Sequence, residues 1–91
     1  MAFLLYIIIM FHVYIIYSKS FSLYYKGFTA DIVTRLEYHN SGKSPYTSKT
    51  NDWELVYSAQ IESKREALIE EKRLKKLNVA SIERLISKYT F

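Results

Sequence analysis

The apolar start of the chain limits what it can fold into more than any other feature. Residues 2–11 are uninterrupted apolar, and a second apolar run, residues 13–17, follows His12. A membrane-spanning helix needs about 20 apolar residues, and the histidine interrupts this stretch before that length is reached. The enrichment in Ile, Val and Tyr favours a β-strand over Phe11–Ser18. A membrane anchor formed by residues 2–17 is the alternative.

Met10 bears on where the domain begins. If Met10 is the true start, residues 1–9 are a mis-assigned extension; otherwise they form a short apolar leader. Neither the basic segment nor the small-residue cleavage site of a signal peptide is visible. The remaining length suffices for one hydrophobic core and not for two. We therefore expect a single domain over residues 10–91.

The composition excludes several kinds of chemistry. The chain has no cysteine and only two histidines. Disulfide frameworks, cysteine-based zinc sites and thiol nucleophiles are therefore excluded, and the metal to expect is a hard, oxygen-bound ion such as Mg²⁺ or Mn²⁺. The formal net charge of +4 fits a nucleic-acid or anionic membrane partner, although a solvated basic surface also accounts for it. The lack of cysteine fits a reducing cytosol, so we expect a cytoplasmic protein.

Six elements are predicted in the order β-β-α-β-α-α. The strands are indicated by clusters of β-branched and aromatic residues, and each helix by a capping residue that precedes an apolar pattern of helical spacing. We expect an α/β (α+β) fold in which a small three-stranded antiparallel sheet is flanked by helices. The expected strands cover residues 11–18, 23–28 and 53–59, and the expected helices begin near residues 30, 63 and 78.

The first two strands are expected to form a hairpin that brings two tyrosines together. If the pairing centres on Lys19–Ser20, Tyr14 lies directly opposite Tyr25. Because side chains alternate along a strand, Lys26 then points to the other face. Tyrosines in strands are usually packing residues, which is the simpler explanation.

Polar side chains stand out on two of the expected helices. Arg35 and His39 are four residues apart and so share a helix face, where a guanidinium suits a phosphate and an imidazole can transfer a proton. A solvated face is the simpler explanation. Glu71 falls on an apolar stripe, where a carboxylate is costly unless it is paired or bound to a cation. An ion pair with Lys75 is the simpler explanation there, and Glu70 is a competing carboxylate.

Basic residues are concentrated in the second half of the chain. Most such runs are solvated helix faces, but cations that lie together can follow a phosphate backbone. On that interpretation the candidate nucleic-acid contacts are Lys43, Lys49, Lys72, Arg73, Lys75 and Lys76, with Lys64 and Arg65 in the same run.

A set of short segments carries a more specific signal. The segments HVY (residues 12–14) and YKG (residues 25–27) hold two tyrosines eleven residues apart, and Arg35 follows the second by ten. RLEYHNSG, WELVY and EALIEEKRLKKL come next, in that order. In their order and spacing, these segments resemble the GIY-YIG nuclease superfamily, in particular its small stand-alone bacterial members related to the N-terminal nuclease domain of the excinuclease of DNA repair. The likeness covers residues 10–86.

The resemblance implies a metal-dependent endonuclease that hydrolyses DNA phosphodiester bonds. Tyr14 and Tyr25 correspond to the motif tyrosines. Arg35 corresponds to the catalytic arginine, His39 to the histidine near it, and Glu71 to the ligand of Mg²⁺ or Mn²⁺. The implied partner is DNA, branched or duplex, and we expect a monomer or weak homodimer that is not attached to a membrane.

Two departures from the family pattern keep other functions open. His12 stands where the first motif has its name-giving glycine, and Lys26 stands where the second usually has an apolar residue. One alternative is therefore a catalytically inactive module of the same fold that binds nucleic acid. The other is a small membrane-anchored structural protein, which accounts for neither the motif spacing nor Glu71.

Overall fold

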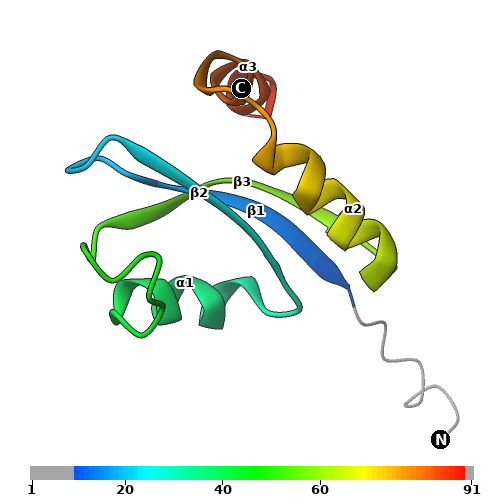
Figure 1. Cartoon of the computed structure of the whole chain (residues 1–91). Helices are drawn as coiled ribbons and strands as arrows, with labels where there is room; N and C mark the ends of the chain where they lie inside the picture. Colours follow the sequence, from blue (N-terminus) through cyan, green and yellow to red (C-terminus); the bar gives the residue numbers. More distant parts are fainter. Residues whose placement is uncertain (1–9, 90–91) are drawn as a thin grey trace, which may run out of the picture.

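Three antiparallel strands form one sheet in the computed structural model, which describes residues 10–89 (Figure 1). The strand order is β2-β1-β3, with β1 (Phe11–Ser18) central and β2 (Leu23–Thr29) and β3 (Trp53–Ile61) at the edges. The helices are α1 (Ile32–Asn40), α2 (Lys64–Lys75) and α3 (Val79–Tyr89). The α+β class and the order β-β-α-β-α-α are thus confirmed.

The apolar segment at the start of the described residues is the central strand of the sheet. It pairs with β3 from Phe11 and with β2 from His12 onward. Four successive residues, Val13, Tyr14, Ile15 and Ile16, are buried. A strand covered on both faces needs apolar residues at successive positions, which explains the uninterrupted pattern. Within residues 10–89, the helices have nine to twelve residues, and none is long and apolar enough to cross a bilayer. The leader expected over residues 1–9 lies outside the described part of the chain.

Each face of the sheet is covered by different helices. Val13 and Ile15 point toward α2 and α3, where Leu74 lies in the same buried cluster. Tyr14 and Ile16 point to the opposite face and form a second cluster, against which α1 packs. Figure 1 shows α1 below the sheet and α2 and α3 above it. The alternation along β1 therefore assigns its side chains to two separate cores.

The register of the β1–β2 hairpin differs from the expected one. Tyr14 pairs with Gly27 and Ile16 with Tyr25, so the two tyrosines are offset instead of opposite. The turn spans residues 19–22, and its centre lies one residue later than predicted. Because the resulting shift is an even number of residues, both tyrosines keep the predicted face.

Capping residues start the helices where the sequence indicates. The Asp31 carboxylate accepts hydrogen bonds from the Thr34 backbone N–H and hydroxyl, at 3.2 and 2.8 Å, which identifies Asp31 as the α1 cap. Ser63 and Asn78 each accept a hydrogen bond from the N–H three residues later and so begin α2 and α3. Gly42 follows α1 with φ +79°, a left-handed conformation that favours glycine.

Two apolar residues of the helices lie on the surface. Val33 is 66% exposed and Leu68 is 42% exposed. Each helix touches the sheet along a narrow strip: α1 packs through Ile32 and Leu36, and α2 buries Leu74. Residues one position outside such a strip already face solvent.

Candidate active site

A cavity of about 960 Å³ lies at the β2 edge of the sheet. Its walls come from β1, β2, one side of α1 and the side of α2 that faces the sheet. Four of the five predicted catalytic side chains line it, each from a different element: Tyr14, Tyr25, Arg35 and Glu71. The fifth, His39, is buried behind Tyr14.

Tyr14 reaches this cavity because its strand partner has no side chain. A Cβ atom on Gly27 would lie 2.6 Å from the Tyr14 hydroxyl oxygen and 2.8 Å from Cζ. The phenol therefore lies across the backbone of β2 at Gly27, in the space that any larger residue would fill. This gives the glycine of the second motif a steric role that its position in the sequence did not reveal.

His39 links Tyr14 to the loop after α1. Its Nε2 lies 2.8 Å from the Tyr14 hydroxyl and its Nδ1 lies 2.8 Å from the Thr47 hydroxyl. Burial, and secondarily the charge of Arg35, lowers the pKa of His39 below its ordinary value. The imidazole is therefore neutral at pH 7, with one ring nitrogen donating and the other accepting.

No pattern in the sequence marks Thr47 as part of the site. It is fully buried, and its carbonyl accepts a hydrogen bond from the indole of Trp53 at 3.0 Å. Asn40 holds the end of this loop, because its side-chain amide exchanges two hydrogen bonds with the Trp53 backbone, at 2.8 and 3.0 Å. The loop between α1 and β3 thus supplies one of the two partners of His39.

Both tyrosines are held as neutral phenols. Burial raises the pKa of Tyr14, and the neighbouring Tyr25 adds to the shift. Burial also raises the pKa of Tyr25, with Glu71 as the second cause and Arg35 opposing it. Arg35 lowers the pKa of Tyr25, but burial and the nearby carboxylate outweigh it.

Arg35 lies on the exposed side of α1 and lines the cavity. Its guanidinium carbon is 5.2 Å from the centre of the Tyr38 ring, a cation–π arrangement that orients the side chain. Within residues 10–89 it forms no ion pair with a carboxylate. Its donors are therefore available to an anionic ligand, whereas His39, on the same helix face, is buried.

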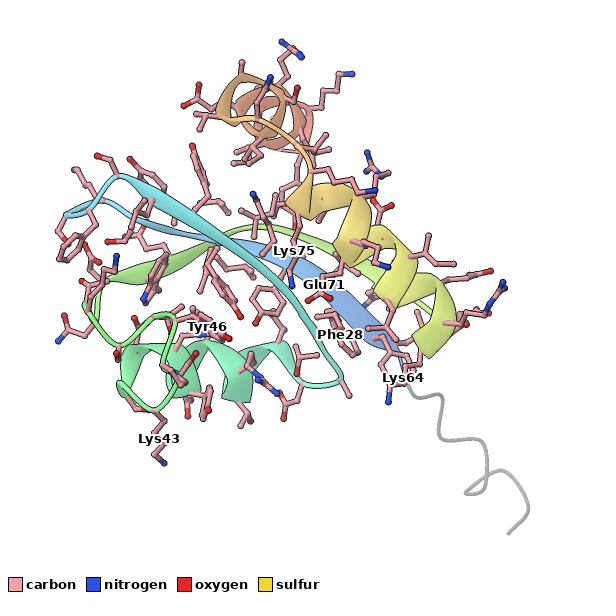
Figure 2. The ribbon with its side chains drawn as sticks, in the orientation of Figure 1. Phe28, Lys43, Tyr46, Lys64, Glu71 and Lys75 are labelled. Atoms are coloured by element: carbon pink, nitrogen blue, oxygen red, sulfur yellow. The ribbon has the colours of Figure 1, made fainter. Side chains whose placement is uncertain are left out.

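Glu71 enters the cavity from α2. Its side chain is 16% exposed, and its Oε2 lies 3.6 Å from Nζ of Lys75, so the ion pair considered from the sequence does form. Figure 2 shows Glu71 extending from α2 toward the sheet, with Phe28 beside it. The competing carboxylate, Glu70, instead binds Arg73 through two hydrogen bonds of 2.6 and 2.8 Å.

The donor set fits a largely hydrated hard cation. Within residues 10–89, no three His, Asp or Glu side chains cluster to form a closed metal cage. Mg²⁺ commonly keeps several waters and uses only one or two carboxylates together with substrate phosphate oxygens. The half-buried carboxylate of Glu71, at the wall of an open cavity, matches that mode of binding.

The predicted nucleic-acid contacts are dispersed over the surface. Within the described residues, none of the six lines the cavity. Lys72 and Lys75 border a neighbouring hollow that also includes Glu71. Lys49 lies over the Phe21 ring at 5.5 Å, and Figure 2 shows Lys43 beyond the end of α1, on the side away from Lys64.

The two departures from the motif pattern lie on different parts of β1 and β2. Lys26 pairs with Ile15, whose side chain belongs to the α2-side core, so Lys26 points away from Tyr25 as predicted. His12 pairs with Thr29 near the start of β1, and its buried Nδ1 has no hydrogen-bond partner among the described residues. The structure offers no physical account of that unpaired nitrogen.

The sheet order and the cavity define the protein as a small α+β domain with one candidate active site. Comparison with known proteins identifies its family. The model of the GIY-YIG catalytic domain matches residues 10–84, most of the chain. The chain therefore belongs to the GIY-YIG family, which confirms the resemblance seen in the sequence.

The relatives include small proteins named UPF0213. One from Halobacterium salinarum is 38% identical over 77 residues, covering 84% of this chain and 99% of the relative. One from Oceanobacillus iheyensis is 37% identical over 67 residues, covering 72% and 77%. The solution NMR structure of a UPF0213 protein from Bacillus halodurans has a TM-score of 0.56 and 34% identity, covering 86% of this chain and 83% of that one. These names state no activity, so they bear on family and fold.

Proposed function

We propose that this protein is an endonuclease that hydrolyses DNA phosphodiester bonds with one divalent ion, Mg²⁺ or Mn²⁺. The observation that carries the proposal is the shared cavity, because a guanidinium, a carboxylate and two phenols from four separate elements line it. That set provides a phosphate contact, a metal ligand and proton-transfer groups, which are the requirements of metal-assisted hydrolysis. Membership of the GIY-YIG family supports the same reaction.

Arg35 binds the scissile phosphate in this proposal. Its planar guanidinium can donate two parallel hydrogen bonds to phosphate oxygens, and the Tyr38 ring limits the directions it can take. Negative charge builds up on those oxygens as water attacks. A cation already oriented toward them stabilises the transition state more than the ground state.

Glu71 would hold the metal ion. When bound, the ion would supply positive charge to the phosphate and lower the pKa of a bound water. Glu71 would give up its ion pair with Lys75, at a small cost in free energy because Lys75 is largely exposed and the 3.6 Å separation is loose. Lys75 is then free to turn toward solvent or a nearby phosphate.

Tyr14 and His39 take the proton that the attacking water loses. The raised pKa of Tyr14 makes its phenol a poor base by itself. With the phenol donating to Nε2 of His39, however, the Tyr14 oxygen can accept the water proton while its own proton passes to the imidazole. Thr47 supports this tautomer by accepting the hydrogen bond from Nδ1–H.

Tyr25 acts as a donor in the same scheme. Its raised pKa keeps the hydroxyl protonated at neutral pH. Its ring packs edge-on against the His39 ring, with ring centres 4.9 Å apart. From β2 it can donate to a phosphate oxygen or to the attacking water. Loss of this hydroxyl should therefore slow the reaction less than loss of Glu71.

The test is a cleavage assay with supercoiled plasmid and with labelled branched and duplex oligonucleotides. Each substrate is incubated with Mg²⁺, Mn²⁺ or EDTA. We expect metal-dependent cleavage that is lost in Arg35→Ala and Glu71→Gln. The matched control is Glu70→Gln, which removes an adjacent carboxylate that binds Arg73 and does not line the cavity.

Two outcomes would point elsewhere. Cleavage that survives in both active-site variants would place the chemistry at another site or in a contaminant. Absence of cleavage on every substrate, with salt-sensitive DNA binding retained, would favour the inactive binding module. The change at His12 in the first motif is the sequence observation that would then carry more weight.

A further inference from the structure

Lys64 differs from the other lysines in its position. Among the lysines of residues 10–89, it alone lines the active-site cavity, together with Arg35 and Glu71. It is the first residue of α2, directly after the capping residue Ser63. Its side chain is exposed and forms no ion pair within the described part of the chain. A cation is thus present in the cavity without a protein partner.

Other cations on α2 are engaged or face elsewhere. Arg73 is held by both carboxylate oxygens of Glu70, and Lys75 is paired with Glu71. Lys72 borders the neighbouring hollow that Leu68 and Ile69 line. The availability of Lys64 therefore reflects its place at the start of the helix and not the basic composition of α2 as a whole.

The cavity wall separates Lys64 from the reaction centre by an aromatic ring. Figure 2 shows Phe28 between Glu71 and Lys64, and all three residues line the cavity. Phe28 also packs against Phe11, with ring centres 6.4 Å apart. A phosphate bound by Arg35 near Glu71 would therefore have Lys64 beyond it along the wall, with an apolar surface in between that suits a sugar or a base.

The charges of the lining residues support two phosphates. The two cations, Arg35 and Lys64, offset the two carboxylates, Asp31 and Glu71, so the wall alone is formally neutral. One divalent ion would leave the site with two net positive charges. Two successive phosphodiesters, each carrying one negative charge, would neutralise them. A volume of about 960 Å³ is at the upper end of the range for ligand sites and exceeds the needs of one phosphate.

We propose that Lys64 binds the phosphate adjacent to the scissile one and thereby fixes the position of the strand in the cavity. This rests on the proposed nuclease function, and it makes Lys64 a positioning residue. A lysine acts here as a point charge toward a neighbouring phosphate, whereas Arg35 provides the directional contact at the reacting one. The direction from Glu71 past Phe28 to Lys64 would be the direction in which the strand leaves the reaction centre.

The experiment compares Lys64→Gln with Arg65→Gln in the full chain. Arg65 is the next residue of the same helix turn, is also exposed and does not line the cavity. Binding of a fluorescein-labelled oligonucleotide is measured in EDTA over a series of salt concentrations. We expect Lys64→Gln to weaken binding about threefold to fivefold, the size of an exposed ion pair, and to reduce the slope of log K against log salt by about 0.7–0.9.

A second arm uses the cleavage reaction and a modified substrate. Oligonucleotides carrying one neutral methylphosphonate are compared, with the modification at either phosphate next to the cleaved bond. At one of these positions the modification should raise KM for the wild-type protein and for Arg65→Gln, and have no further effect on Lys64→Gln. For each of the three proteins, kcat should change little between the modified and the unmodified substrate.

The outcomes separate this proposal from the proposed function. Equal salt slopes for Lys64→Gln and Arg65→Gln would overturn the role of Lys64 even if the wild-type protein cleaves DNA. If nothing cleaves but the difference in slope is found, the nuclease proposal fails while the phosphate contact is supported. Absence of both DNA binding and cleavage by the wild-type chain would overturn both.

Discussion

Replacement of Gly27 by alanine tests the packing on which the site is built. The added Cβ would lie 2.6 Å from the Tyr14 hydroxyl oxygen and 2.8 Å from Cζ, closer than non-bonded atoms approach. The obstacle is not the far end of a flexible chain, because Tyr14 is 2% exposed and its ring is fixed by the core. The phenol must shift, and the shift breaks its 2.8 Å hydrogen bond to His39.

The cost can be estimated from three contributions. Overpacking a core by one methyl costs about 1–3 kcal/mol. Leaving a buried imidazole nitrogen without its partner costs about 1–3 kcal/mol more. Replacing a strand glycine by alanine stabilises the fold by about 0.5–1 kcal/mol, because less backbone entropy is lost on folding. We therefore expect Gly27→Ala to reduce the free energy of unfolding by about 1–5 kcal/mol. The central value of about 3 kcal/mol corresponds to a fall in Tm of roughly 12–24 °C for a domain of this size.

Urea denaturation followed by Trp53 fluorescence measures this cost. Trp53 is the single tryptophan and is 4% exposed, so its emission reports loss of the α1-side core. The control is Gly42→Ala, where φ is +79° and nothing lies within 4 Å of the added Cβ. Its expected cost is the left-handed strain alone, about 1–2 kcal/mol. A Gly27→Ala cost no larger than that of Gly42→Ala would refute the reasoning.

Three further predictions concern the charged groups. Burial lowers the pKa of His39 from its ordinary value of 6.5, so the unfolded chain takes up this proton first as pH falls. The free energy of unfolding should therefore decrease as the pH drops through about 6.5. Urea denaturation at a series of pH values should show a shallower decrease for His39→Gln. Lys75→Gln should raise Mn²⁺ affinity about twofold to fivefold in EPR titrations, with Lys76→Gln unchanged, because only Lys75 pairs with Glu71. Asp52→Asn should lower Tm by several degrees at pH 7, because three hydrogen bonds hold the pKa of that carboxyl well below its usual range, and the difference from wild type should shrink on acidification below pH 4.

The elements of the fold could be predicted from the sequence because their signals are local. Asp31, Ser63 and Asn78 precede their helices by one residue and cap them through hydrogen bonds to the N–H three positions on. The central strand could be read from its β-branched residues. Spacing within the motifs also singled out four side chains that line one cavity, while their chemical roles stay predictions.

The hairpin register could not be predicted because a distant residue fixes the turn. The Asp52 carboxylate accepts hydrogen bonds from the Ser18 hydroxyl at 2.7 Å and from the Ser20 backbone N–H at 2.9 Å. These contacts join positions 34 and 32 residues apart in the chain. A local pattern such as a polar turn contains no information about them, so the expected centre was displaced by one residue.

The same limitation applies to the residues that support the site. Thr47 is one of several hydroxyl residues in a polar loop, and only the fold brings it to His39. The basic run on α2 likewise gave no indication of which cations face the cavity. Within the described residues that distinction falls to Lys64, because the start of α2 faces the cavity while the positions of Lys72 and Arg73 do not.

The corrected register makes one further prediction, about the coupling between Gly27 and Tyr14. Tyr14→Phe removes both the hydrogen bond to His39 and the atom that lies nearest to the added Cβ of Gly27→Ala. In the double variant the same hydrogen bond cannot be lost twice, and part of the clash is absent. The two costs should therefore fall short of additivity by about 1–2 kcal/mol in urea denaturation, as expected for residues in contact. Costs that add to within about 0.5 kcal/mol would show that the Tyr14 hydroxyl does not lie across Gly27 in solution.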